Sequence, residues 1–149
     1  MIKIALPFAS ALLLAACGRT LATSSVAQTQ LAPPDAFRCV MKQFDTLGFQ
    51  RTMYDTQDLR TSAKKVNPKI TFSNTQFRKA WDRLEVEVKS GTTGTDLNVV
   101  ASTVAEYFSQ NGQNFNPLPP SKEVQEAARA LEQKCGGSGP NPNTAPYAQ

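Results

Sequence analysis

The sequence predicts an α+β fold, a two-layer sandwich in the order α-β-β-β-β-α, with an antiparallel sheet and two helices on one of its faces. Apolar residues recur at helical spacing in two segments, near 35–47 and 122–135. Between these segments the apolar period changes to two, and turn-forming sequences separate the candidate strands. Strands grouped into hairpins between two amphipathic helices are typical of this class.

The first helix is predicted to follow Pro33-Pro34-Asp35, with Asp35 as its N-cap. Its apolar positions lie at i, i+3, i+4, i+7 and i+10, and they are Phe37, Val40, Met41, Phe44 and Leu47. Gly48 follows as a C′ residue, which commonly ends a helix. This stripe of methionine and aromatic residues indicates a buried core face.

Four strands are predicted after this helix. Residues 49–54 and 59–66 form one hairpin around a polar turn, and residues 83–89 form the clearest strand because apolar and charged residues alternate strictly. Residues 96–107 return from a glycine-containing loop as the longest strand. The stretch 67–80, which begins with Asn-Pro, is predicted to be a loop with at most one short element.

The alternation in 96–107 is imperfect. Leu97, Val99 and Ala101 share one face, whereas Val100 and Val104 fall on the other. Two interpretations remain open from the sequence: a bulge near Val99 and Val100 that shifts the register, or partial cover of the second sheet face.

The second helix is predicted to begin after a proline-rich loop at 111–120, with Ser121 as its N-cap. Its apolar stripe consists of Val124, Ala127, Ala128, Leu131 and Cys135. Gly136 and Gly137 end it. The remaining tail carries three prolines and almost no apolar residues, so it is predicted to be disordered.

The N-terminus has the features of an export signal: Lys3 precedes an apolar run over 4–14, which is too short to span a bilayer. The motif Leu14-Ala15-Ala16-Cys17 resembles the lipobox of bacterial lipoproteins cut by signal peptidase II. The resemblance implies removal of residues 1–16, a diacylglyceryl thioether on Cys17 and acylation, such as by palmitate, of the new amino terminus. Gly18 in place of an aspartate implies sorting to the outer membrane, on its periplasmic face.

Four segments follow from this interpretation: a signal peptide at 1–16, a lipidated and flexible tether at 17–33, a single α+β domain at 34–136, and a disordered tail at 137–149. A flexible tether of this length has a span of about 22 Å. With Cys17 bound to lipid, Cys39 and Cys135 are the remaining cysteines, and we expect them to form a disulfide in an oxidising compartment.

Catalytic and metal-binding chemistry is not predicted. The chain contains no histidine, no C-x-x-C, no G-x-S-x-G and no phosphate-binding glycine motif. Glu85 and Glu87 lie on one face of a strand, and we interpret them as part of a solvated face with Arg83 and Lys89 rather than as an acid–base pair. We therefore expect no enzyme activity, no metal and no cofactor.

Charge is distributed unevenly along the chain. The segment 60–83 contains seven basic residues and one acid, whereas the chain from Leu84 onward contains four basic and seven acidic residues. Basic and aromatic residues mixed in this way suit an anionic surface. The candidate contacts are Lys64, Lys65, Lys69, Arg78, Lys79 and Trp81.

The expected function is a non-catalytic binding or scaffolding domain that is accessory to an envelope assembly. The alternative is a carrier or sensor of an anionic or amphiphilic ligand, such as a lipid or lipopolysaccharide. The expected partners are the membrane through the N-terminal lipid anchor and either an envelope protein or an anionic lipid. Nucleic acid is not expected, because of the predicted compartment.

Overall fold

A computed structural model describes residues 20–137 of the chain, so the predicted signal peptide, Cys17 and almost all of the predicted tail lie outside the described residues. The elements are β1 (Ala22–Thr29), α1 (Pro33–Thr46), β2 (Gln50–Asp55), β3 (Arg60–Asn67), β4 (Phe77–Ser90), β5 (Thr95–Ser109), β6 (Gly112–Leu118) and α2 (Lys122–Cys135). Neither helix in this range is long and apolar enough to cross a membrane.

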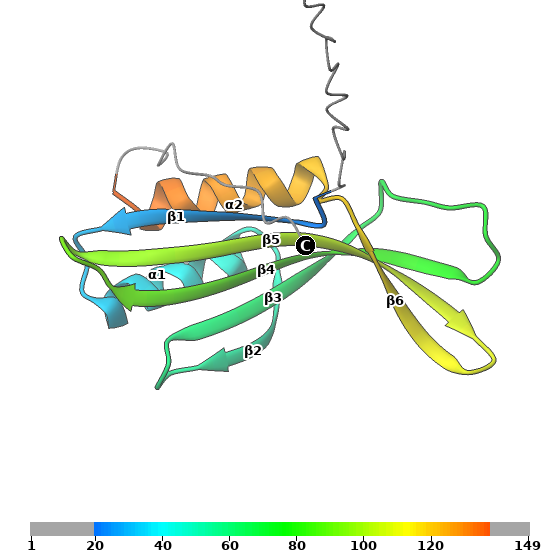
Figure 1. The fold of residues 1–149 in the computed structure, drawn as a ribbon, viewed down its shortest axis with the longest axis horizontal. Helices are drawn as coiled ribbons and strands as arrows, with labels where there is room; N and C mark the ends of the chain where they lie inside the picture. The colour runs from blue at the N-terminus through cyan, green and yellow to red at the C-terminus, as the bar shows by residue number, and fades with distance from the viewer. Residues whose placement is uncertain (1–19, 138–149) are drawn as a thin grey trace, which may run out of the picture.

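All strand pairs are antiparallel, and the sheet order is β1-β5-β4-β3-β2, with β6 also paired to β5. The two strands β1 and β6 lie end to end along one edge of β5. Ala22 of β1 pairs with Ser102, and Leu118 of β6 pairs with the next residue, Thr103. Figure 1 shows β6 and the neighbouring ends of β4 and β5 extending past both helices.

The predicted order α-β-β-β-β-α is wrong. The segment expected to be a flexible tether contains β1, and the proline-rich segment expected to be a loop contains β6. The expected two-layer sandwich is wrong as well, because six strands form a sheet that is longer than its helical cover, and strand outweighs helix by 49% to 24%. The broader prediction of an α+β fold with an antiparallel sheet is confirmed.

The core lies between the sheet and the two helices, which contact each other and both contact β4 and β5. Helix α2 begins at the predicted cap, where the Ser121 hydroxyl accepts the backbone N–H of Val124 at 3.0 Å. Its predicted stripe is buried throughout. Helix α1 buries most of its predicted stripe, but it begins earlier than expected: Ala32 is the N-cap, and Asp35 lies in the first turn. Gly48 follows with a φ of 73°, as a C′ residue requires.

The predicted disulfide is confirmed. Cys39 of α1 and Cys135 of α2 are bonded, with their Cα atoms 5.7 Å apart and a sequence separation of 96. The bond therefore joins the two helices to each other on the same side of the sheet.

The register of β5 settles the question about Val99 and Val100. Pairing with β4 runs without interruption from Asp96 to Glu106, so the bulge interpretation is wrong. Val100 and Val104 lie on the face away from the helices and are half-buried by their neighbours on that face. An irregularity does occur in β4, at Arg78, between the pairs made by Phe77 and Lys79.

Candidate binding surface

The face of the sheet opposite the helices, here called the open face, carries four of the six predicted contact residues. In β4 the even-numbered residues from Ala80 to Val88 are buried toward the helices, so Lys79 and Trp81 lie on the open face. Lys64 pairs with Arg83 and lies there too. Arg78 reaches this side at the irregularity in β4. The remaining two, Lys65 and Lys69, lie on the helix side.

Trp81 is the centre of this group. The amino groups of Lys64 and Lys79 lie over its ring, at 4.3 Å and 4.6 Å from the ring centroid. The indole N–H donates to the carboxylate of Glu106, a residue only 8% exposed. Cation–π contacts and the hydrogen bond hold the ring in one orientation.

Two aromatic residues that the sequence did not single out extend this group. Phe108 and Phe115 are 54% and 53% exposed. Phe108 pairs with Gln113 and Phe115 with Glu106, so the two rings are diagonal neighbours on the open face. The guanidinium of Arg78 lies 5.6 Å from the Phe108 ring centroid. The sequence feature that could have indicated the β5–β6 hairpin, and with it the proximity of Phe108 and Phe115, is the turn-forming dipeptide Asn111-Gly112. Gly112 has a φ of 104°.

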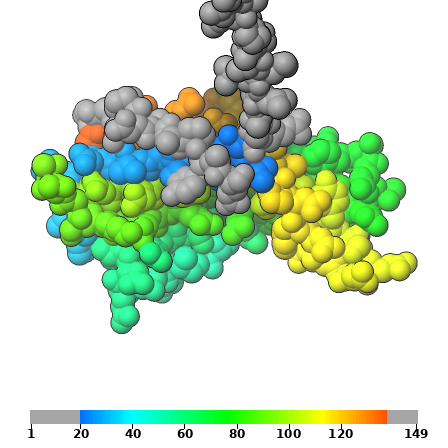
Figure 2. Space-filling model, in the orientation of Figure 1, coloured from blue at the N-terminus to red at the C-terminus, as the bar shows by residue number. Residues whose placement is uncertain are grey.

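These residues define the cationic–aromatic patch, which consists of Lys64, Arg78, Lys79, Trp81, Phe108 and Phe115. Among residues 20–137, none of its three cations takes part in an ion pair. Its aromatic end, with Phe108 and Phe115, belongs to the β5–β6 hairpin, which protrudes past the helices in Figures 1 and 2. The patch therefore presents uncompensated positive charge beside exposed apolar rings.

The other half of the open face differs in charge. A groove of about 670 Å³ runs there across five strands, and its floor includes Glu85, Glu87 and Lys89. Glu87 is paired with both Arg60 and Lys89. The hydrogen bond from Lys89 and, less strongly, that from Arg60 lower the pKa of Glu87, although burial opposes them. These acids are neutralised by neighbours, as the solvated-face interpretation predicts.

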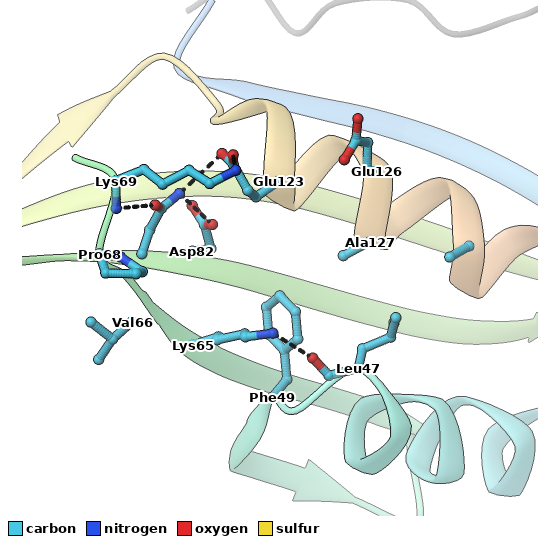
Figure 3. A pocket seen from close by; sticks show the side chains of 12 residues that line it. Leu47, Phe49, Lys65, Val66, Pro68, Lys69, Asp82, Glu123, Glu126 and Ala127 are labelled. Atoms are coloured by element: carbon cyan, nitrogen blue, oxygen red, sulfur yellow. Dashed lines mark hydrogen bonds and ion pairs between the residues drawn. The ribbon is translucent and has the colours of Figure 1, made fainter.

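A second groove, of about 460 Å³, lies on the helix side between the end of α1, β3 and the first half of α2 (Figure 3). Its apolar lining includes Leu47 and Phe49, which follow α1, and Ala127 and Ala130 of α2. The two predicted contact residues that are absent from the open face, Lys65 and Lys69, line this groove.

Both of these lysines already have partners inside the protein. Lys65 donates to the backbone carbonyl oxygen of Leu47 at 2.8 Å. Lys69 donates to a carboxylate oxygen of Glu123 at 2.6 Å. That hydrogen bond, the backbone N–H of Glu123 and a contact from Asn67 lower the pKa of Glu123 to about 2. The same contact raises the pKa of Lys69. The pair stays charged over a wide pH range, and the groove rim offers less free positive charge than the patch.

Other ligand types find less support. Residues 20–137 contain no group of three His, Cys, Asp or Glu side chains placed to hold a metal ion. Known proteins give no guidance either, because no family model matches the chain and no curated protein has a significantly similar sequence.

Proposed function

We propose that this chain is a lipoprotein of the bacterial outer membrane, anchored on the periplasmic side through Cys17, whose domain binds an anionic surface without catalysing a reaction. The observation that carries this proposal is the cationic–aromatic patch. Three cations that make no ion pair within residues 20–137 lie with three aromatic rings on one sheet face that neither helix covers. Long-range attraction by such a cluster favours an anionic partner and weakens with salt.

The anchor predicts the first outcome. Because the lipid would be attached through the thiol of Cys17, Cys17→Ala is expected to abolish lipidation and leave an unprocessed or soluble protein. Metabolic labelling with a fatty acid, followed by membrane fractionation, measures both effects. A processed, lipid-labelled alanine variant in the membrane fraction would contradict the lipobox interpretation.

The patch predicts the second outcome. In the triple variant Lys64→Glu, Arg78→Glu and Lys79→Glu, association with membrane components is expected to be lost, because three attractive charges become repulsive. Pull-down from membranes with native lipids retained measures the association. The free energy of unfolding is expected to fall by no more than about 2 kcal/mol, since the lost contacts are three cation–π pairs at the surface, made by Lys64, Arg78 and Lys79.

A matched control carries the same change in net charge on the helices. Lys42→Glu, Lys122→Glu and Arg129→Glu alter exposed cations far from the patch and are expected to retain the association. If both triple variants lose it equally, net charge rather than the patch governs binding. If neither loses it, the open face is not the binding surface.

The same pull-down separates the kinds of partner. A protein recovered in fixed ratio with the parent and lost from the patch variant supports an accessory role in an envelope assembly. An amphiphile that stays bound to the patch variant instead points to the helix-side groove, whose apolar walls suit an acyl chain, and to a carrier or sensor function.

A further inference from the structure

We propose that the anionic surface bound by the cationic–aromatic patch is the phospholipid bilayer in which the chain is anchored. This inference rests on the proposed function and names its partner. Phe108 and Phe115 would enter the interfacial region of the bilayer, Trp81 would lie at headgroup level, and Lys64, Arg78 and Lys79 would contact lipid phosphates.

The position of β1 supports a bilayer over a distant partner. The sequence led us to expect a flexible tether up to residue 33, but the chain is already part of the sheet at Ala22. Only five residue steps separate Cys17 from Ala22, and a fully extended chain covers at most about 18 Å in that distance. A lipid on Cys17 therefore holds the sheet close to the membrane.

The patch lies near this point of attachment. Ala22 and its partner Ser102 are on the open face, and the next pair along β4 and β5 on that face is Trp81 with Val104. From the spacing of strands and residues in a sheet, the Cα atoms of Ala22 and Trp81 are about 12 Å apart. The position at which the anchored segment joins the sheet is therefore close to the patch.

The composition of the patch also suits a membrane interface. Trp, Phe, Lys and Arg are the residues that populate the boundary between headgroups and acyl chains, because aromatic rings bury apolar area there while cations meet phosphate. Glu106 is the patch's acidic neighbour, and it is buried and hydrogen-bonded to Trp81, so it presents little charge to a lipid surface.

The chain carries its own probe, because Trp81 is its single tryptophan. The protein used is the mature chain from residue 17 with Cys17→Ser, so that binding does not depend on the anchor. With vesicles of phosphatidylethanolamine and phosphatidylglycerol, Trp81 emission is expected to shift to shorter wavelength and to be quenched by brominated acyl chains. With phosphatidylcholine vesicles neither change is expected.

Variants of the patch test which groups carry the binding. Arg78→Gln and Lys79→Gln are each expected to lower partitioning into the anionic vesicles about fivefold. Phe108→Ser with Phe115→Ser is expected to lower it about tenfold, since two half-exposed rings lose their apolar contact. The matched control, Lys42→Gln with Arg129→Gln on the helices, is expected to bind as the parent does.

Three results would overturn the inference: unchanged Trp81 emission with anionic vesicles, unaltered partitioning of the Phe108 and Phe115 variant, or an equal loss in the helix control. The proposed function is tested separately. If the parent chain does not bind pure lipid vesicles, but the patch variant loses a protein partner in the pull-down from membranes, the bilayer is not the partner. The patch would then remain the binding surface for that protein.

Discussion

Replacing Cys39 and Cys135 with serine is expected to lower the free energy of unfolding by about 4–5 kcal/mol. The bond closes a loop with a sequence separation of 96, which spans most of the described chain. In the chain-entropy model a crosslink of this length removes much of the freedom of the unfolded state. Since small domains are stable by about 5–15 kcal/mol, the loss is a large fraction of the total.

Urea unfolding followed by circular dichroism measures this difference. The parent unfolded in the presence of a reductant is the control, and it is expected to match the double serine variant. A variant whose midpoint and slope equal those of the oxidised parent would show that the disulfide contributes nothing to stability.

Asp82→Ala is expected to cost about 3–4 kcal/mol, the second largest effect. Asp82 is 3% exposed, and its carboxylate accepts hydrogen bonds at 2.8–2.9 Å from Asn67, Thr103 and Ser121. Removing the carboxylate leaves these three groups without their acceptor, and each buried unpaired polar group is costly. The network joins β3, β4, β5 and the cap of α2, so its loss reaches four parts of the fold.

Asp58→Ala is the matched control, because that aspartate is exposed in the β2–β3 turn and the change is expected to stay within about 0.5 kcal/mol. Thermal and urea unfolding of both variants provide the comparison. An Asp82→Ala protein as stable as the Asp58→Ala protein would show that water replaces the carboxylate without cost. Among residues 20–137 no buried side-chain polar atom lacks a partner in the parent, which is why a loss is expected here.

The helices and the disulfide could be predicted because the residues that form them carry strong local signals. Helix α2 combines a serine cap with an apolar stripe whose every member is buried. The second half of β4 is predicted correctly from Leu84, Val86 and Val88, which alternate with charged residues and are all buried, but the strand begins at Phe77, within the stretch expected to be a loop. In each case the spacing of apolar residues along the sequence identifies the face of the helix or strand that is buried.

Strand β1 gave no such pattern. Its residues facing the helices are small, and the two that are buried are Ala27 and Thr29. A larger residue does not fit, because a side chain at Gly136 would already lie 3.0 Å from the Cβ of Ala27. The end of α2 packs so closely on β1 that only small residues fit there. Small residues are also typical of linkers, so the composition of β1 does not indicate a strand.

Strand β6 was missed for a different reason. Pro117 lies within it and pairs with Val104, and proline is generally read as a strand breaker. Proline is tolerated on an edge strand, where one side of the backbone makes no ladder hydrogen bonds. Missing β6 also hid Phe115. The contact of Arg78 with Phe108 could not be inferred because the start of β4 fell within the stretch 67–80, which was expected to be a loop. The sequence shows the basic stretch, but it does not show that Lys64 lies on the open face and Lys65 on the helix side, because this assignment depends on the pairing register of β3.

The long strand β5 is paired along one edge by β1 and β6, which are the first and the second-to-last elements within residues 20–137. Hairpins such as β4–β5 and β5–β6 join neighbours in sequence and close quickly, whereas 65 residues lie between the end of β1 and the start of its partner β5. Because a chain is synthesised from its N-terminus, β1 emerges first but cannot pair until β5 has emerged. Until then half of that edge of β5 has unpaired backbone groups, and a strand from another polypeptide can compete for it.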